Sequence, residues 1–181
     1  LLGLSALPTA HPLNKGMLGM HGNLGPNINT NKCDVLIAVG MRFDDRVTGK
    51  LDSYAKQAKI IHLDIDPSEL GKNVKVDVPV LGDCKKSLAL LCDLVQENKH
   101  TAWIESFSEY EQKEYEHVIE PELFPKEGPL NMGEVINAVS EATRHEAILV
   151  TDVGQNQMFA ARYFKFSKER SIITSGGLGT M

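Results

Sequence analysis

The charged side chains that follow the apolar run 35–39 are the first candidates for chemistry in this sequence. The run ends at Gly40, and four charged residues come next, Arg42, Asp44, Asp45 and Arg46. A guanidinium group matches the oxygen geometry of phosphates and carboxylates, and a glycine lets a ligand approach the backbone closely. We therefore expect this loop to bind an anionic ligand. The alternative is a surface loop whose charges neutralise one another.

A second apolar run, 60–65, contains Asp64 and is followed by Asp66. An acidic residue at the end of a parallel strand can hold the ribose hydroxyls of a nucleotide. Capping of the short helix predicted to begin at Pro67 is the alternative role for either carboxylate. The fingerprint G-x-G-x-x-G is absent, so an ordinary NAD-binding Rossmann site would lack its main loop here.

Three glycine-rich segments, 18–22, 152–157 and 175–181, are further candidates. The last two follow predicted strands, and such turns expose backbone N–H groups that suit a diphosphate. His21 is either part of a ligand platform or an ordinary loop residue. The six histidines show no metal-ligand spacing, and no Ser-His-Asp or Cys-His set is evident. We therefore expect neither a metal site in this segment nor acyl-transfer hydrolysis.

Hydrophobic periodicity and turn residues predict the elements that position these candidates. We expect strands at 35–39, 60–65, 76–81, 147–151 and 170–174. We expect helices at 27–31, 47–57, 67–70, 84–98, 101–118, 131–144 and 155–163. Short apolar runs bounded by Gly or Asp-Pro are typical of strands that are buried on both faces, as in parallel sheets. The fold class predicted is therefore α/β, with parallel sheets flanked by helices.

Helix-start signals sharpen two of these predictions. Asp83 is a suitable N-cap for the helix 84–98, whose apolar stripe we expect to be buried: Leu88, Leu91, Cys92 and Val95. Asn131 and Glu134 have the spacing of a capping box. The proline- and glycine-rich stretch 121–130 precedes this capping box. It is the best candidate for a domain boundary.

Composition limits the class of protein. With 42% hydrophobic and 24% charged residues in 181, the chain is globular. A net charge of −5 with no Lys/Arg cluster argues against nucleic acid or an anionic membrane as the partner. No apolar segment reaches about 18 residues, so we expect no membrane span. Three cysteines without CxxC spacing favour a reduced, cytoplasmic protein. Because the chain starts without methionine and stops after a glycine-rich segment, we expect a piece of a longer protein.

Taken in order, the segments GMLGMHG, AVGMRFDDRVTGK, IIHLDID, VTDVGQNQM and SGGLGTM resemble the catalytic large subunits of the acetolactate synthase (acetohydroxyacid synthase) family, which depends on thiamine diphosphate. The resemblance covers nearly the whole chain. It implies parts of two three-layer α/β/α domains. Residues 1–120 would be the later part of a middle, FAD-binding domain, 121–130 a linker, and 131–181 the start of the thiamine-diphosphate-binding domain.

The resemblance also implies site residues. FAD would be bound by Leu18, Gly19, Met20, His21, Gly40, Met41, Arg42, Phe43, Asp44, Asp64, Ile65, Asp83 and Cys84. Thiamine diphosphate would be bound by Gln155, Asn156, Gly179, Thr180 and Met181, and Arg46 would lie at the substrate channel. The family more often has histidine where this chain has Asn156. The activating glutamate and the magnesium motif of the family have no counterpart in this segment, so no catalytic residue is expected here.

The activity implied by the resemblance is decarboxylation of pyruvate and condensation with a second 2-oxo acid, in branched-chain amino-acid biosynthesis. Thiamine diphosphate, Mg²⁺ and FAD would be the cofactors. A homodimer or higher oligomer, with a possible regulatory small subunit, would be the assembly, and the segment alone would be inactive. The alternatives are a stand-alone nucleotide- or flavin-binding module, or a related enzyme such as glyoxylate carboligase or pyruvate oxidase.

Overall fold

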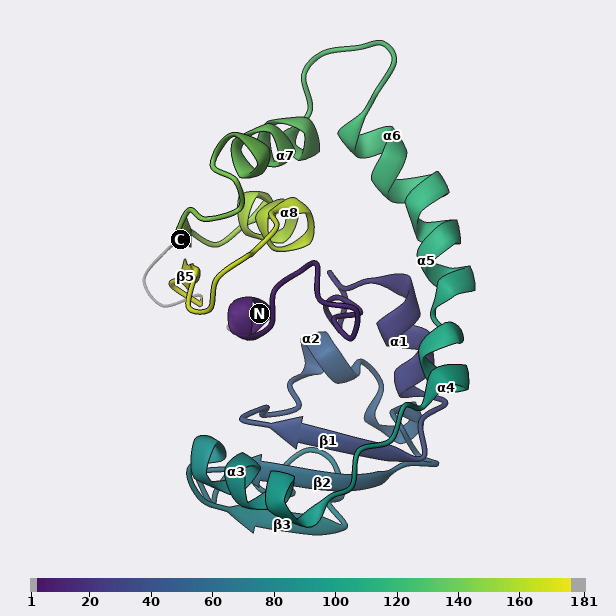
Figure 1. Cartoon of the computed structure of the whole chain (residues 1–181), viewed down its shortest axis with the longest axis vertical. Helices are drawn as coiled ribbons and strands as arrows, with labels where there is room; N and C mark the ends of the chain where they lie inside the picture. The colour runs from purple at the N-terminus through teal and green to yellow at the C-terminus, as the bar shows by residue number, and fades with distance from the viewer. Residues whose placement is uncertain (1–2, 177–181) are drawn as a thin grey trace. The chain divides into compact units, whose positions relative to one another are not determined.

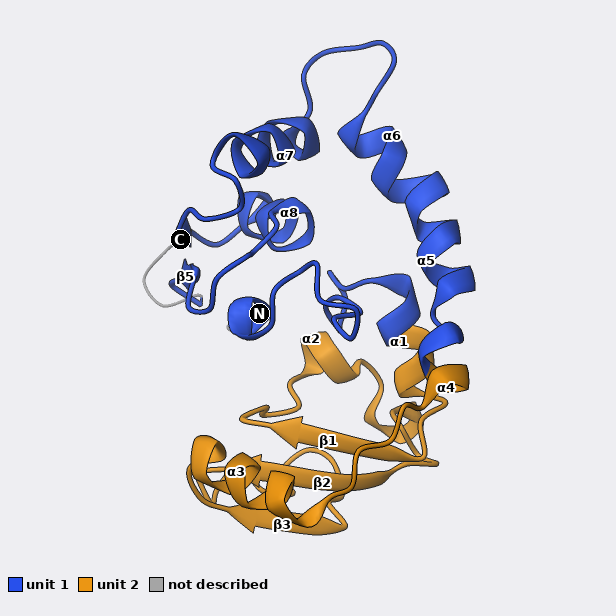
Figure 2. Cartoon of the chain, viewed as in Figure 1, with its two compact units in different colours: residues 1–26, 104–181 blue, residues 27–103 orange. Residues whose placement is uncertain are grey.

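The computed structural model describes residues 3–176. These residues form two parallel sheets with flanking helices (Figure 1), so the predicted α/β fold class is confirmed. The chain divides into two compact units (Figure 2). Unit 1 comprises residues 1–26 and 104–181, and unit 2 comprises residues 27–103. Among the described residues, no helix combines the length and the apolar composition needed to cross a bilayer.

The sheet of unit 2 has the order β1-β2-β3, with all neighbours parallel. Its strands are β1 (Val35–Val39), β2 (Lys59–Asp64) and β3 (Val78–Leu81). In the register, Ala38 lies opposite His62, which in turn lies opposite Pro79. Proline cannot donate to a ladder and is found mainly on edge strands, which is where β3 lies among the described residues. The predicted strands 35–39, 60–65 and 76–81 are thus found within one or two residues of their predicted bounds.

The helical segments around this sheet are short. They are α1 (Leu24–Thr30), α2 (Asp45–Thr48), the 3₁₀ turn η2 (Leu51–Ser53), α3 (Cys84–Leu94) and α4 (Thr101–Glu105). The helix predicted at 47–57 is wrong, because Gly49 at φ +58° and Ala55 at φ +45° leave the helical backbone conformation. The helix predicted at 67–70 is also wrong. Turns occupy it instead, and Asp66 Oδ1 accepts a hydrogen bond from Ser68 N at 2.8 Å.

The core of unit 2 lies on one face of the sheet and consists of Ala38, Phe43, Tyr54, Ala55 and Ile60. On the other face the alternate residues of β1 are exposed: Val35, Ile37 and Val39. Successive strand residues point to opposite faces, and the described elements cover only one face of β1, so the prediction of burial on both faces is wrong for this strand. The predicted apolar stripe of α3 is likewise not buried, since no residue of that helix is.

Unit 1 contains most of the helical structure. Its elements are the 3₁₀ turn η1 (Leu4–Ala6), α5 (Ser108–Glu114), the π-helical turn η3 (Tyr115–Ile119), α6 (Glu120–Leu123), α7 (Met132–Ala142) and α8 (Gln155–Tyr163). A parallel pair, β4 (Leu149–Thr151) and β5 (Ile172–Thr174), completes it. Its main apolar cluster is Phe164, Phe166 and Ile172.

Two features of the unit 1 helices bear on the sequence predictions. The helix predicted at 101–118 is interrupted before Ser108 and then continues to Leu123, so that Pro121 lies in the first turn of α6. Proline has no N–H to donate, and the π-helical turn η3 directly before α6 already departs from the regular i→i−4 hydrogen-bond pattern there. The capping box of α7 is confirmed: Asn131 Oδ1 accepts from Glu134 N at 2.9 Å, and Glu134 Oε2 accepts from Asn131 N at 3.1 Å.

Candidate functional site

The predicted residues that follow β1, β2 and β3 lie at one edge of the unit 2 sheet. Gly40 N donates to Leu63 O at 2.8 Å, and Gly82 N donates to Asp64 O at 2.9 Å. The Cys84 thiol donates weakly to the same Leu63 carbonyl, with Sγ 3.7 Å from the oxygen. In open parallel sheets, ligands bind outside this edge, formed by the carboxyl ends of the strands. The structure therefore brings the loop after Gly40, Asp64 and the start of α3 together.

The backbone of the first loop is held in a strained conformation. Phe43 has φ +51°, a left-handed conformation that a bulky residue rarely adopts. Asn73 Nδ2 donates to the carbonyls of Arg42 at 3.2 Å and Phe43 at 3.1 Å, which fixes the turn from outside. The Phe43 ring is 2% exposed and packs edge-on against Tyr54. The side chain of Phe43 therefore supports the loop from the core, and strain of this kind clusters at ligand sites.

The charges of this loop pair with their neighbours. Arg42 Nη2 lies 3.2 Å from Asp44 Oδ2, and Arg46 Nη1 lies 3.4 Å from Asp45 Oδ1. Both arginine side chains are largely exposed, so each fork can turn to an incoming anion at little cost. The other carboxylate oxygen of Asp44, Oδ1, is buried and has no hydrogen-bond partner among the described residues. The charges of the loop are thus neutralised locally, which is the alternative raised from the sequence. The loop also has an unused acceptor in Asp44 Oδ1.

The end of β2 places a histidine behind Asp64. Asp64 Oδ1 accepts from Asp66 N at 2.9 Å, while Oδ2 lies 3.7 Å from His62 Nε2, beyond hydrogen-bond distance. His62 is 0% exposed, packs edge-on against Phe43 with ring centroids 5.1 Å apart, and neither ring nitrogen has a hydrogen-bond partner in the described structure. The sequence analysis missed His62. Its alternation with Ile60 and Asp64 on one face of the strand was the available signal.

Three further predicted residues have different surroundings at this edge. Ile65 is 69% exposed, so its side chain is open to a ligand. Asp83 Oδ1 accepts from Lys86 N at 3.0 Å, which confirms Asp83 as the N-cap of α3. Hydrogen bonds from Ser68 lower the pKa of Asp66, which keeps this neighbouring carboxyl ionised.

The predicted flavin residues Leu18, Gly19, Met20 and His21 lie in unit 1, in a tight loop. Gly22 N donates to Gly19 O at 2.9 Å, and Asn23 N donates to Met17 O at 2.7 Å. Gly19 is buried, Leu18 and His21 are half-buried, and the Met20 side chain is 71% exposed. The loop therefore presents Met20 outward from a closed backbone.

The predicted thiamine diphosphate residues Gln155 and Asn156 open helix α8. Gly154 precedes them with φ +142°, a conformation that other residues rarely adopt. Asn156 Oδ1 accepts from Gln157 N at 2.7 Å, and both Gln155 and Asn156 are exposed. Gln157 Nε2 donates to Thr174 Oγ1 at 2.6 Å, which ties the start of α8 to β5. The other predicted residues of this set, Gly179, Thr180 and Met181, lie outside the described residues.

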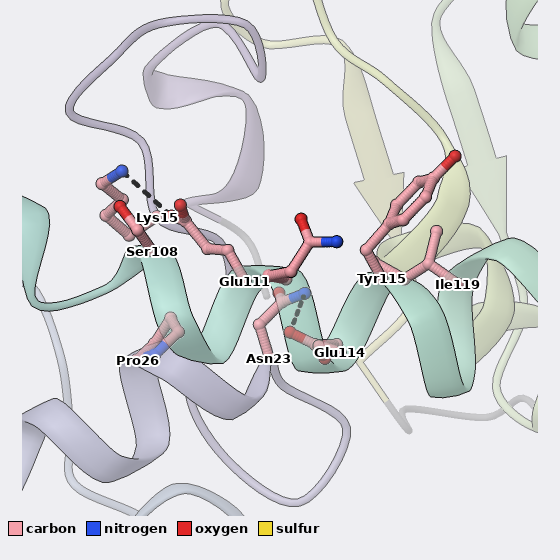
Figure 3. Close-up of a pocket in the computed structure, with 9 residues that line it drawn as sticks. Lys15, Asn23, Pro26, Ser108, Glu111, Glu114, Tyr115 and Ile119 are labelled. Atoms are coloured by element: carbon pink, nitrogen blue, oxygen red, sulfur yellow. Dashed lines mark hydrogen bonds and ion pairs between the residues drawn. The ribbon is translucent and has the colours of Figure 1, made fainter.

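A separate hollow of about 470 Å³ lies along α5 and η3 in unit 1 (Figure 3). Its lining includes Lys15, which pairs with Glu111 at 2.9 Å, and Glu114, which is held by Asn23. None of the sequence-predicted site residues that the structure describes lines it. Within residues 3–176, no group of three or more His, Cys, Asp or Glu side chains is arranged to hold a metal ion.

Two parts of the chain match known domain families. Residues 1–91 match the central domain of thiamine pyrophosphate enzymes, and residues 152–181 match their C-terminal, TPP-binding domain. This chain belongs to the thiamine pyrophosphate enzyme family. The strand-end edge of unit 2 falls in the central-domain match, and the start of α8 falls in the TPP-binding match.

Individual relatives align with the chain over its whole length. A probable acetolactate synthase large subunit of Methanocaldococcus jannaschii is 44% identical, and the aligned part is 31% of that protein. The acetolactate synthase large subunit of Parasynechococcus marenigrum is also 44% identical, over 29% of its length. Acetolactate synthase 1, chloroplastic, of Oryza sativa is 41% identical, over 28% of its length. The chain thus spans less than a third of these curated relatives.

Proposed function

We propose that this chain is a segment of an acetolactate synthase catalytic subunit, which decarboxylates pyruvate and condenses the product with a second 2-oxo acid in branched-chain amino-acid biosynthesis. The observation that carries the proposal is the alignment of the whole chain with large subunits of that name at 41–44% identity. Residues 1–120 would belong to the middle domain and 131–181 to the start of the cofactor domain, with 121–130 between them.

The chemistry of the strand-end edge suits FAD. The flavin nucleotide is rich in hydroxyl donors and carries a diphosphate. Asp64 Oδ2 and the unpartnered Asp44 Oδ1 are acceptors for hydroxyls, and the exposed forks of Arg42 and Arg46 match phosphate oxygens. The strained backbone at Phe43 supports the same assignment. In this role Asp64 would hold the ribose, and Gly40 would let the backbone approach the ligand.

The start of α8 suits part of thiamine diphosphate. When bound, this cofactor supplies the carbanion chemistry that decarboxylation and carbon–carbon bond formation require. The chain's own contribution would be to bind and orient it through Gln155 and Asn156, whose exposed side chains follow the glycine turn at Gly154. Mg²⁺, the second 2-oxo acid, the oligomer and a regulatory small subunit belong to this proposal as parts of the whole enzyme. So does a cytoplasmic location, although the rice relative is named chloroplastic.

The test of this proposal is a reconstitution of the full-length polypeptide that carries this segment. With pyruvate as the only substrate, acetolactate should form when thiamine diphosphate, Mg²⁺ and FAD are all present, and omission of thiamine diphosphate should abolish it. Failure to form acetolactate with all three cofactors bound would overturn the proposal. The related alternatives, glyoxylate carboligase, pyruvate oxidase and a stand-alone flavin module, gain no support from the names of the relatives described above.

A single substitution tests the flavin part. Asp64→Ala removes a charged acceptor worth about 1.5–3 kcal/mol, so flavin affinity should fall about tenfold or more. Asp52→Ala, an exposed aspartate of η2, is the matched control and should retain wild-type flavin content. Equal flavin content in both variants would contradict the assignment of Asp64.

A further inference from the structure

The loop 16–23, which contains the proposed flavin residues of unit 1, is closed by its last side chain. Asn23 Oδ1 accepts from Met17 N at 3.0 Å, and Asn23 N donates back to Met17 O. A Cβ atom on Gly22 would lie 2.2 Å from the Met17 carbonyl oxygen, so no other residue fits there without moving the loop. The shape of this loop therefore depends on where Asn23 is held.

Glu114, at the end of α5, holds that closing residue. Its Oε2 accepts from Leu24 N at 3.0 Å and from Asn23 Nδ2 at 3.4 Å, and the residue is 6% exposed (Figure 3). A buried carboxylate needs donors or a counter-charge on every side. The backbone and side chain of the loop supply donors to one oxygen, and a cation pairs with the other oxygen.

Arg162, near the end of α8, is that cation. Its Nη2 pairs with Glu114 Oε1, and its Nη1 donates to Gly22 O at 2.9 Å. One guanidinium thus contacts both the loop and the carboxylate that holds the loop. Lysine has no fork with which to do both. Consecutive residues of the loop end, Gly22 to Leu24, are therefore fixed by one buried ion pair.

Helix α8 carries this contact to the other proposed cofactor site. Gln155 and Asn156 open the helix, and Arg162 follows about two turns later. Because a helix of this length is stiff, a shift of its first turn moves Arg162, and through it Gly22 and Asn23. The start of α8 and the loop 16–23 are thus mechanically connected within unit 1.

From these contacts we infer that Glu114 and Arg162 are positioning residues that couple the flavin loop 16–23 to the thiamine diphosphate end of α8. The inference rests on the proposed function. Binding of either cofactor favours the loop and helix arrangement that the other one needs, so each raises the affinity for the other. Linkage requires that the two effects be the same factor.

The test measures the coupling factor, which is the ratio of the thiamine diphosphate dissociation constants without and with bound FAD. It uses the full-length polypeptide that carries the segment. The dissociation constant of thiamine diphosphate, with Mg²⁺ constant, is determined by fluorescence titration of flavin-depleted and FAD-loaded protein. We expect FAD to tighten thiamine diphosphate binding at least about fivefold, the lower end of typical coupling. In Glu114→Gln the factor should fall towards one, and in Arg162→Lys it should be intermediate.

Lys165→Gln is the matched control, because Lys165 forms an exposed ion pair with Glu141 just beyond the same helix. It should retain the wild-type factor. Because Arg162→Lys preserves the positive charge, it still tests the inference if Glu114→Gln fails to fold. A wild-type factor of one with both cofactors bound, or an unchanged factor in both variants, would overturn the inference.

The outcomes separate this inference from the proposed function. If wild-type protein binds both cofactors and forms acetolactate without any coupling, the function stands and the inference fails. If wild-type protein binds no FAD at all, the flavin part of the proposed function fails, and the inference fails with it.

Discussion

The strand-end edge of unit 2 and the loop network of unit 1 hold their residues by different forces. At the strand ends, backbone hydrogen bonds join Gly40 to Leu63 and Gly82 to Asp64 over a packed core. In unit 1, the loop 16–23 depends on the buried pair Glu114–Arg162. Breaking a buried pair leaves an uncompensated charge, whereas a backbone ladder has no such weak point. The first site should therefore respond to changes in packing, and the second to changes of a single charge.

The largest expected effect tests the packing side of this comparison. Phe43→Ala removes a buried ring that supports both the core of unit 2 and the loop after Gly40, and it should cost about 3–5 kcal/mol of unfolding free energy. Chemical denaturation followed by circular dichroism measures the loss. Arg42→Ala, an exposed neighbour on the same loop, is the control and should cost less than about 1 kcal/mol while still weakening flavin retention. Similar losses in the two variants would contradict the assignment of Phe43 to the core.

A pH experiment probes the same core. Burial raises the pKa of Tyr54 to about 12 from its ordinary value of 10.0, because the charged phenolate is poorly solvated there. Since the folded pKa is raised, the stability is fully present below about pH 10 and is lost as the pH rises from 10 towards 12, by about 1–2 kcal/mol after allowance for solvent screening. Denaturation midpoints measured from pH 8 to 12 should show this loss. Tyr54→Phe should remove it, and an identical decline in that variant would disprove the assignment.

Helix caps offer a smaller test that compares the two units directly. Asn131 and Glu134 cap α7 reciprocally, while Asp83 caps α3 through one bond. Asn131→Ala should cost about 1 kcal/mol or more, and Asp83→Ala about 0.5 kcal/mol, within the usual range for N-caps. Thermal denaturation of the two variants measures both losses. A larger loss from Asp83→Ala would reverse the expected order.

The smallest effect is expected at His62. Because neither ring nitrogen has a hydrogen-bond partner in the described structure, His62→Leu exchanges an unpaired polar group for an apolar one of similar volume. We expect the unfolding free energy to stay within about 1 kcal/mol of wild type. Urea denaturation provides the measurement. A loss several times larger would mean that His62 makes a contact that this structure does not show.

These two regions also differ in how far the sequence predicts them. The strands, the loop after Gly40 and the acidic end of β2 follow from local patterns, in which an apolar run is followed directly by polar residues. The network around Glu114 joins residues from three distant segments, and no local pattern marks Glu114 or Arg162 as buried. The helix predicted at 47–57 failed because left-handed backbone at Gly49 and Ala55 overrides helical spacing. The apolar stripe of α3 gave the helix correctly but not its burial, which depends on what packs over it.

Pro79 limits where a further strand can pair with the sheet of unit 2. It sits in β3, at the edge of the described strands, where it provides no N–H for a neighbour. A further strand cannot complete a regular ladder along that side, so β3 resists the edge-to-edge association that unprotected strands invite. Strand β1 has no proline, and it forms the other edge of this sheet among the described strands, where its outer side is available for pairing. Any chain that extends this sheet, by folding or by aggregation, would therefore add beside β1, and Pro79→Val would remove this asymmetry.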